Sequence, residues 1–203
     1  MAANSRKNLI LASGSAIRQE MLRNAGVEFH VATAKVDEAA IRAALLAERA
    51  NPWDIADALA EAKARKVSAK EPEALVIGCD QVLDFGGEII SKPRDREELR
   101  EHLERLSGQR HRLLSAVVIY EDGQPVWRHV GVVRLQMREI SAGYLNEYLE
   151  RNTENLMYSA GGYQLESEGV RLFAKIEGDY FTVLGLPLVE LLGYLTARGV
   201  IFG

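Results

Sequence analysis

The chain is poor in cysteine, since its 203 residues include only Cys79. A single cysteine excludes an internal disulfide and a zinc cage built from several thiolates, and it is typical of a reducing compartment. We therefore expect a cytoplasmic protein. The sequence also lacks an apolar run near the ~20 residues that cross a bilayer, so we expect no membrane partner.

An excess of basic residues is also absent, and the formal net charge is −4. Without a global positive field the chain is not expected to bind a nucleic-acid backbone. If a polyanion binds to this protein, it must bind at a local cluster of cations.

Several catalytic motifs are missing as well. There is no GxxxxGK[ST] phosphate loop, no GxSxG elbow around Ser13, Ser15 or Ser159, and no HExxH pair. A serine hydrolase and a zinc enzyme are therefore disfavoured.

No repeat, low-complexity tract or long Pro/Gly linker divides the chain. Its length suffices for one sizeable core. We predict a single domain over residues 1–203, with two lobes around a cleft as an alternative arrangement.

Strand-like and helix-like segments alternate through the first half of the chain. The turn composition of residues 121–125 joins two strands into a hairpin, which excludes a purely parallel sheet. We therefore predict an α/β protein with a mixed central sheet flanked by helices. The predicted strands are 9–12, 27–33, 74–79, 88–90, 113–120 and 126–137, and the predicted helices follow 15, begin near 54, span 95–106 and 141–149, and begin at 187.

The first candidate site is the turn Ser13-Gly-Ser15 with Arg18 after it. A strand that enters a helix through such a turn presents free backbone N–H groups and the positive end of the helix dipole. Arg18 lies on the first turn, where its guanidinium can bind a phosphate. The alternative is an ordinary helix cap beside a surface arginine.

The second candidate is Asp80-Gln81, which follows the apolar strand 75–79. Ligands of open α/β sheets bind beyond the carboxyl ends of strands. A carboxylate at this point either ends the strand or takes part in chemistry.

Other charged residues are scattered along the chain. Asp37-Glu38 follows the second strand, Lys63 lies on a helix, and Lys92 follows the Gly86-Gly87 turn and a short strand. Each alone is more often a solvated surface charge. Together they supply carboxylates for Mg²⁺ and cations for phosphates.

An ordered set of motifs, spanning about residues 8–199, resembles the Maf family of nucleotide pyrophosphatases. The motifs are Leu-Ala-Ser13-Gly-Ser15 with Arg18, Val36-Asp37-Glu38, Glu61-Ala-Lys63-Ala, Val76-Ile-Gly-Cys-Asp80-Gln81 and Ser91-Lys92-Pro93, followed by Leu106-Ser-Gly, Ala160-Gly-Gly-Tyr, Ile176-Glu-Gly-Asp and Leu184-Gly-Leu-Pro-Leu.

The resemblance implies an enzyme that hydrolyses a nucleoside triphosphate to a monophosphate and pyrophosphate with Mg²⁺ or Mn²⁺. It makes Asp80 the general base and a metal ligand with Glu38, and it places Arg18, Lys63 and Lys92 in the phosphate-binding cleft. It also implies an elongated α/β protein with a central cleft, related to inosine triphosphate pyrophosphatases and often dimeric. Ser13 and Ser15 are predicted to bind the substrate with these cations.

Three positions are linked in the family to the choice of base, and here they hold Ile17, Gln81 and Glu168. Gln and Glu are the pair of the 7-methyl-GTP branch, whereas the dTTP/UTP branch carries Thr and Gln. Glu168 can accept from the two adjacent N–H donors of a guanine edge. The chain departs from the usual Ser-x-Ser-Pro-Arg-Arg pattern, and Ile17 cannot stack on a cationic base as Trp does. A guanine-type base is therefore favoured.

Three alternatives stay open at this point. One is a dTTP/UTP pyrophosphatase of the same family, and another is an inosine or xanthosine triphosphatase. The third is a non-catalytic nucleotide sensor that regulates septum formation, which has no need of a base such as Asp80.

Overall fold

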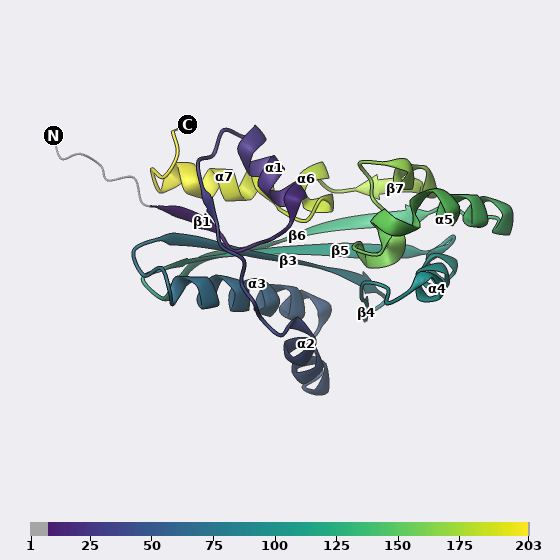
Figure 1. Ribbon diagram of the computed structural model, residues 1–203, viewed down its shortest axis with the longest axis horizontal. Coiled ribbons are helices and arrows are strands. Elements are labelled where there is room, and N and C mark those ends of the chain that lie inside the picture. The colour runs from purple at the N-terminus through teal and green to yellow at the C-terminus, as the bar shows by residue number, and fades with distance from the viewer. Residues whose placement is uncertain (1–7, 203) are drawn as a thin grey trace.

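The computed structural model describes residues 8–202 and shows one sheet with helices on both faces (Figure 1). The strand order is β2-β1-β3-β5-β6-β7, with β4 paired to β3. The strands are β1 (Leu9–Leu11), β2 (His30–Val31), β3 (Leu75–Phe85), β4 (Glu88–Ile90), β5 (Arg110–Glu121), β6 (Gln124–Met137) and β7 (Phe173–Glu177). The helices are α1 (Ala16–Asn24), α2 (Glu38–Ala47), α3 (Pro52–Ser68), α4 (Arg96–Leu106), α5 (Ala142–Leu156), α6 (Tyr180–Val183) and α7 (Leu188–Ala197), with 3₁₀ turns η1 (Ala160–Gly162) and η2 (Glu168–Leu172).

The sheet is mixed, as the sequence predicts. β1 pairs in parallel with β2 and β3, whereas the other neighbours are antiparallel. The hairpin of β5 and β6 turns at Asp122 and Gly123, whose φ angles are 50° and 74°. Two positive φ values match the twist of the flanking strands.

Adjacent residues of β3 point to opposite faces of the sheet. Ile77 and Cys79 pack in the cluster that includes α1 and α7, while Val76 and Val82 pack against α3. Figure 1 shows α3 below the sheet and α1 with α7 above it. The sheet is therefore covered on both faces at this end.

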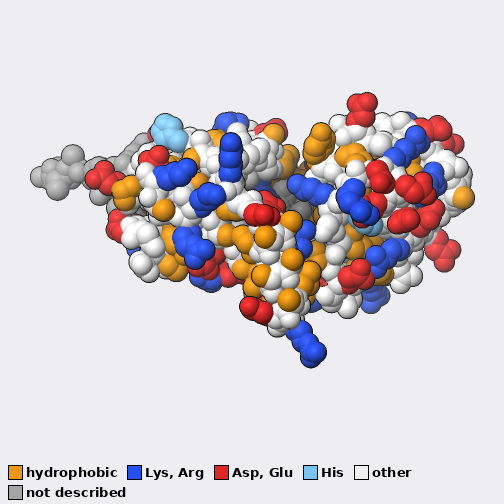
Figure 2. All heavy atoms as spheres, turned by 60° about the horizontal axis from the view of Figure 1, so that its bottom comes forward, with side chains coloured by type: hydrophobic (Ala, Val, Ile, Leu, Met, Phe, Trp, Pro, Cys, Tyr) orange, Lys and Arg blue, Asp and Glu red, His pale blue; other side chains and the backbone are white. Residues whose placement is uncertain are grey.

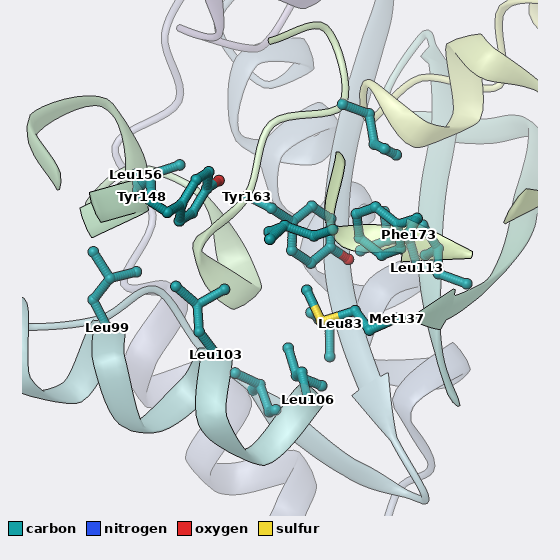
Figure 3. Packing of buried hydrophobic residues seen from close by; sticks show 14 of the residues in the cluster. Leu83, Leu99, Leu103, Leu106, Leu113, Met137, Tyr148, Leu156, Tyr163 and Phe173 are labelled. Atoms are coloured by element: carbon teal, nitrogen blue, oxygen red, sulfur yellow. The ribbon is translucent and has the colours of Figure 1, made fainter. Parts of the chain in front are cut away.

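A third hydrophobic cluster lies at the other end of the long strands, where α4 and α5 pack (Figure 3). Leu99, Leu103 and Leu106 are fully buried there on one face of α4, at the helical spacing that the sequence shows. No helix in the described range 8–202 is long and apolar enough to cross a membrane.

The prediction that the apolar strand ends at Cys79 is wrong. β3 continues through Asp80 to Phe85. The strand accommodates charge because Asp80 pairs with Lys63, and Asp84 pairs with Arg112. Asp80 lies instead beyond the end of β1, since Leu11 is the last residue of β1 and pairs with Ile77.

Other bounds differ from the predicted ones. β2 is only His30–Val31, and α5 continues to Leu156 rather than ending at Leu149. α3 begins at Pro52 and is capped by Asn51, whose Oδ1 accepts from the Asp54 N–H at 3.0 Å. Asp54 in turn accepts from the Asn51 side chain, so the cap is one turn earlier than predicted.

Helix α2 was not predicted at all. Asp37 caps it by accepting from the Ala40 N–H at 2.9 Å. None of its residues is fully buried, and Ile41 and Leu45 pack only partly buried against the α3 cluster.

The backbone of α3 lies directly on β3 at Gly78. A Cβ atom at this position would lie 2.2 Å from the carbonyl oxygen of Ala60 and 2.6 Å from the backbone nitrogen of Ala64. Only glycine allows an approach this close. This approach determines how far the α3 side chains reach across the strand.

We expect Gly78→Ala to destabilise the protein by about 1–3 kcal/mol or more, because α3 must move away from β3 to admit the methyl group. Urea unfolding followed by circular dichroism measures the change. Gly143→Ala is the matched control, since a Cβ there in α5 meets nothing within 4 Å. The control is expected to be neutral or stabilising by up to ~1 kcal/mol. Equal stabilities of the two variants would refute the close approach.

Candidate functional site

A cleft of about 780 Å³ lies at the middle of the molecule, and Figure 2 shows the surface hollowed there with Lys and Arg side chains nearby. Its walls come from the start of α1, from α2, α3, β3 and β4, and from segment 158–166. Nearly all of the predicted site residues meet in this cleft. They are Ser13, Ser15, Ile17, Arg18, Glu38, Lys63, Asp80, Gln81 and Lys92.

Lys63 joins the two predicted metal carboxylates. Its Nζ lies 2.6 Å from Oδ1 of Asp80 and 2.8 Å from Oε1 of Glu38. Asp80 and Lys63 are largely buried, with side chains 9% and 12% exposed, whereas Glu38 opens to solvent. A buried charge is stable only when paired, so the three groups depend on one another.

Lys63 and Glu38 each favour the ionised form of the other. Burial alone would raise the pKa of the Glu38 carboxyl, but the hydrogen bond and the charge of Lys63 outweigh it and hold that pKa below its usual value. Burial alone would lower the pKa of Lys63, but Asp80 and Glu38 raise it above the usual value. At neutral pH the cleft therefore contains an ammonium group and an ionised Glu38.

The turn between β1 and α1 lies at one wall of the cleft. Ser13 is buried, and its Oγ accepts from the Ser15 N–H at 3.3 Å. Ser15 is the N-cap of α1, and its side chain makes no cap hydrogen bond. The Ser15 hydroxyl is thus not used by the helix, and the helix start borders the cleft.

Arg18 lines the cleft, but much of its guanidinium is bound to the protein. Nε donates to the Gly185 carbonyl at 2.8 Å, and Nη1 donates to the Cys79 carbonyl at 3.2 Å and to Ser13 Oγ at 3.4 Å. These bonds hold the charge of Arg18 at a fixed place in the wall. Its positive charge acts on the cleft. Because Nε and Nη1 already donate to protein oxygens, fewer N–H donors remain for a phosphate than the sequence suggests.

Lys92 is exposed just after β4 and contributes to the low pKa of Glu38. A further cation, Arg42, lines the same region and donates from Nη1 to Ser91 Oγ at 2.8 Å. Sequence reasoning missed Arg42. Arg42 is four residues after Glu38, and this spacing places both side chains on one face of a helix. The spacing could identify Arg42 only if α2 were predicted to be a helix.

The orientation of the Gln81 amide is set by its neighbours. Its Nε2 donates to Ser115 Oγ at 2.9 Å and to the carbonyls of Thr182 and Val183 at 3.1 and 3.0 Å. Because all three neighbours accept hydrogen bonds, the nitrogen of the amide, and not its oxygen, must face them. The Gln81 oxygen is therefore the end left for a ligand.

Glu168 is not brought to the cleft wall with the other predicted residues. It lies on η2, where Arg151 at 2.7 Å and Asn152 at 2.9 Å donate to its carboxylate. The hydrogen bonds from Arg151 and Asn152 lower the pKa of Glu168 to about 2. Glu166 and Gln164 line the cleft instead, and no sequence motif marked them.

The donor set fits a hard divalent cation that also binds phosphate. In the described part of the chain no three His, Cys, Asp or Glu side chains are grouped to form a complete metal site. Glu38 and Asp80 nevertheless converge on one ammonium nitrogen. Mg²⁺ commonly takes one or two carboxylates and completes its shell with phosphate oxygens and water.

Comparison with known proteins adds to this geometry. The sequence profile of the family described as Maf-like protein matches residues 8–198. The chain is similar to a protein of Ruegeria pomeroyi named nucleoside triphosphate pyrophosphatase, with 61% identity over 95% of this chain and 97% of the relative. It is also similar to a protein of Brucella abortus named 7-methyl-GTP pyrophosphatase, with 48% identity over 96% and 98% of the two chains. A nucleoside triphosphate pyrophosphatase of Caulobacter vibrioides is 54% identical over 94% and 96%.

Proposed function

Because this chain belongs to the Maf family, we propose that it hydrolyses a nucleoside triphosphate to a nucleoside monophosphate and pyrophosphate. The observation that carries the proposal is the pairing of Lys63 with Glu38 and Asp80 inside a cleft that also contains Arg18 and Lys92. Cations and carboxylates in one cleft suit phosphate chemistry.

Asp80 is the proposed general base. Its Oδ1 accepts from Lys63, and among residues 8–202 no hydrogen bond reaches its Oδ2. This second oxygen accepts the proton of the attacking water. The water oxygen bonds to the α-phosphorus, the bond to the α–β bridging oxygen breaks, and pyrophosphate leaves with the electron pair. Lys63 holds the Asp80 carboxylate in place.

The cations of the cleft bind and neutralise the triphosphate. Lys63, held between Asp80 and Glu38, and the exposed Lys92 supply ammonium groups. Arg18 supplies a fixed charge, and Arg42 adds a fourth cation. Such catalysis is mainly positioning and electrostatic stabilisation. When Mg²⁺ or Mn²⁺ is bound, held by Glu38 and Asp80, it supplies further neutralisation of phosphate charge.

We expect Asp80→Asn to lower turnover by ~10²–10⁴-fold, because an amide cannot accept the proton. Fold and nucleotide affinity are expected to change little, since Lys63 still pairs with Glu38. Pyrophosphate release and equilibrium binding measure the two effects. Asp122→Asn, in the exposed β5–β6 turn, is the matched control and keeps full activity. A variant that retains more than about a tenth of the turnover removes Asp80 from the mechanism.

Activity is expected to need a divalent metal and to give pyrophosphate as the first product. The reason is that Glu38 and Asp80 offset part of the positive charge of the cleft, so the cations there leave a triphosphate incompletely neutralised. Phosphorus NMR identifies the product, and EDTA with Mg²⁺ or Mn²⁺ added back tests the metal. A nucleoside diphosphate with free orthophosphate would place the protein in another reaction class.

We also propose that the base is of the guanine type. Support comes from the Gln81 oxygen, which is left to accept from a ligand, and from Glu166, whose side chain lines the same cleft. Two acceptors match the adjacent N–H donors of guanine, which uracil and thymine do not offer. The relatives of this chain include proteins named 7-methyl-GTP pyrophosphatase.

Catalytic efficiency is therefore expected to be higher for GTP or 7-methyl-GTP than for dTTP or UTP. A buried acceptor without its donor costs ~1–3 kcal/mol, or roughly 5–150-fold in discrimination. Glu166→Gln, from the cleft wall, is expected to reduce this ratio, and Glu168→Gln is the matched variant at the position that the family links to the choice of base. If only Glu166→Gln changes the ratio, Glu166 faces the base and Glu168 does not. A wild-type preference for dTTP or UTP contradicts the guanine proposal.

Two further inferences accompany this function. The lone Cys79 supports a cytoplasmic location, and the family resemblance supports a homodimer. Localisation of a tagged chain in cell fractions tests the first, and sedimentation velocity tests the second.

The presence of both Asp80 and Glu38 in the cleft favours the enzyme over a nucleotide sensor.

A further inference from the structure

A second cavity, of about 510 Å³, lies over the end of the sheet away from β1. Its wall is a ladder of charged side chains in one row of cross-strand neighbours. Asp84 pairs with Arg112, Arg112 with Arg134, and Arg134 with Glu177. A second row places Arg110 beside Gln136 and Gln136 beside Lys175.

This ladder lies on the α3 face of the sheet but beyond the helix. Residues two apart along a strand share a face. Val82 and Leu114 pack in the α3 cluster, whereas Asp84 and Arg112, two residues further along, line the cavity. In Figure 2, where the α3 side comes forward, Lys and Arg side chains gather with acidic ones on the right-hand part of the surface.

The cavity wall has more cations than carboxylates. Asp84 is 1% exposed and pairs with Arg112, and Lys175 lies 2.5 Å from Glu177. Arg110 donates from Nε to the neutral Gln136 at 2.7 Å. Arg134 lies directly opposite Arg112, whose charge Asp84 offsets, whereas Glu177, the other neighbour of Arg134, is shared with Lys175.

The wall also presents donors suited to phosphate. The terminal nitrogens of Arg110, and the whole guanidinium of Arg134, make no hydrogen bond within residues 8–202. Guanidinium forks match the spacing of phosphate oxygens. The Gly86-Gly87 turn at the rim leaves open space, because a Cβ at either glycine would meet nothing within 4 Å.

We propose that this cavity binds an oligophosphate anion, either free pyrophosphate or the phosphate chain of a nucleotide, at a site separate from the cleft. Its volume is in the range of small-molecule sites. The two cavities share no wall residue, although β3 contributes Asp80 to one and Asp84 to the other. The proposal does not depend on the hydrolytic function of the cleft.

Titration of the ¹⁵N-labelled full chain with pyrophosphate tests the second site. Gly14 reports on the cleft, and Gly86 and Gly87 report on the second cavity. We expect both sets of amides to shift with separate saturation curves. A parallel titration with an α,β-methylene nucleotide analogue distinguishes the two sources of the anion: a tighter effect at Gly86 and Gly87 than that of pyrophosphate assigns the site to a nucleotide.

Arg134→Gln is expected to weaken binding at Gly86 and Gly87 by about tenfold or more, because a charge-assisted hydrogen bond is lost, and to leave the Gly14 curve unchanged. Arg110→Gln provides an independent second variant, and Arg65→Gln, exposed on α3, is the matched control. Absence of shifts at Gly86 and Gly87 at millimolar pyrophosphate overturns the proposal. Shifts of equal strength in wild type and both cavity variants overturn it as well.

Discussion

The contact between α3 and β3 at Gly78 is the constraint on which the cleft depends. Because Gly78 has no side chain, the backbone of α3 touches the strand at Ala60 and Ala64. Lys63 lies within this contact, so its ammonium reaches Asp80 on the strand. A wider spacing would leave a buried carboxylate without its partner, and an unpaired buried charge is strongly unfavourable.

The same lysine links the two sides of the cleft. Glu38 begins α2, and its contact with Lys63 ties that exposed helix to the sheet. Arg18 has a comparable role at the opposite wall, where it joins α1 to the Gly185 turn and to the backbone of β3 at Cys79. Gly185 has a φ of 96°, and a Cβ there would lie 3.0 Å from the Arg18 guanidinium. The cleft charges are therefore placed by backbone packing before any ligand arrives.

Positive charge is local in this acidic protein. With a net charge of −4, the molecule as a whole repels phosphate. Cations cluster at the cleft and again around Arg110 and Arg134. At these two places the local charge is positive, although the net charge of the molecule is negative. Each cluster includes a β3 carboxylate, Asp80 or Asp84, that is paired with a cation.

The sequence by itself determined the mixed α/β class, the β5–β6 hairpin and the buried face of α4, because local patterns of turn residues and apolar spacing specify these features. Family motifs also identified most residues that meet in the cleft, although their roles stay predictions. Only the tertiary structure decided that β3 runs through Asp80, that Lys63 pairs with both carboxylates, and that Glu166 rather than Glu168 lines the cleft. These features depend on contacts between residues far apart in the chain, where the close approach at Gly78 and the donors around Glu168 outweigh local preference.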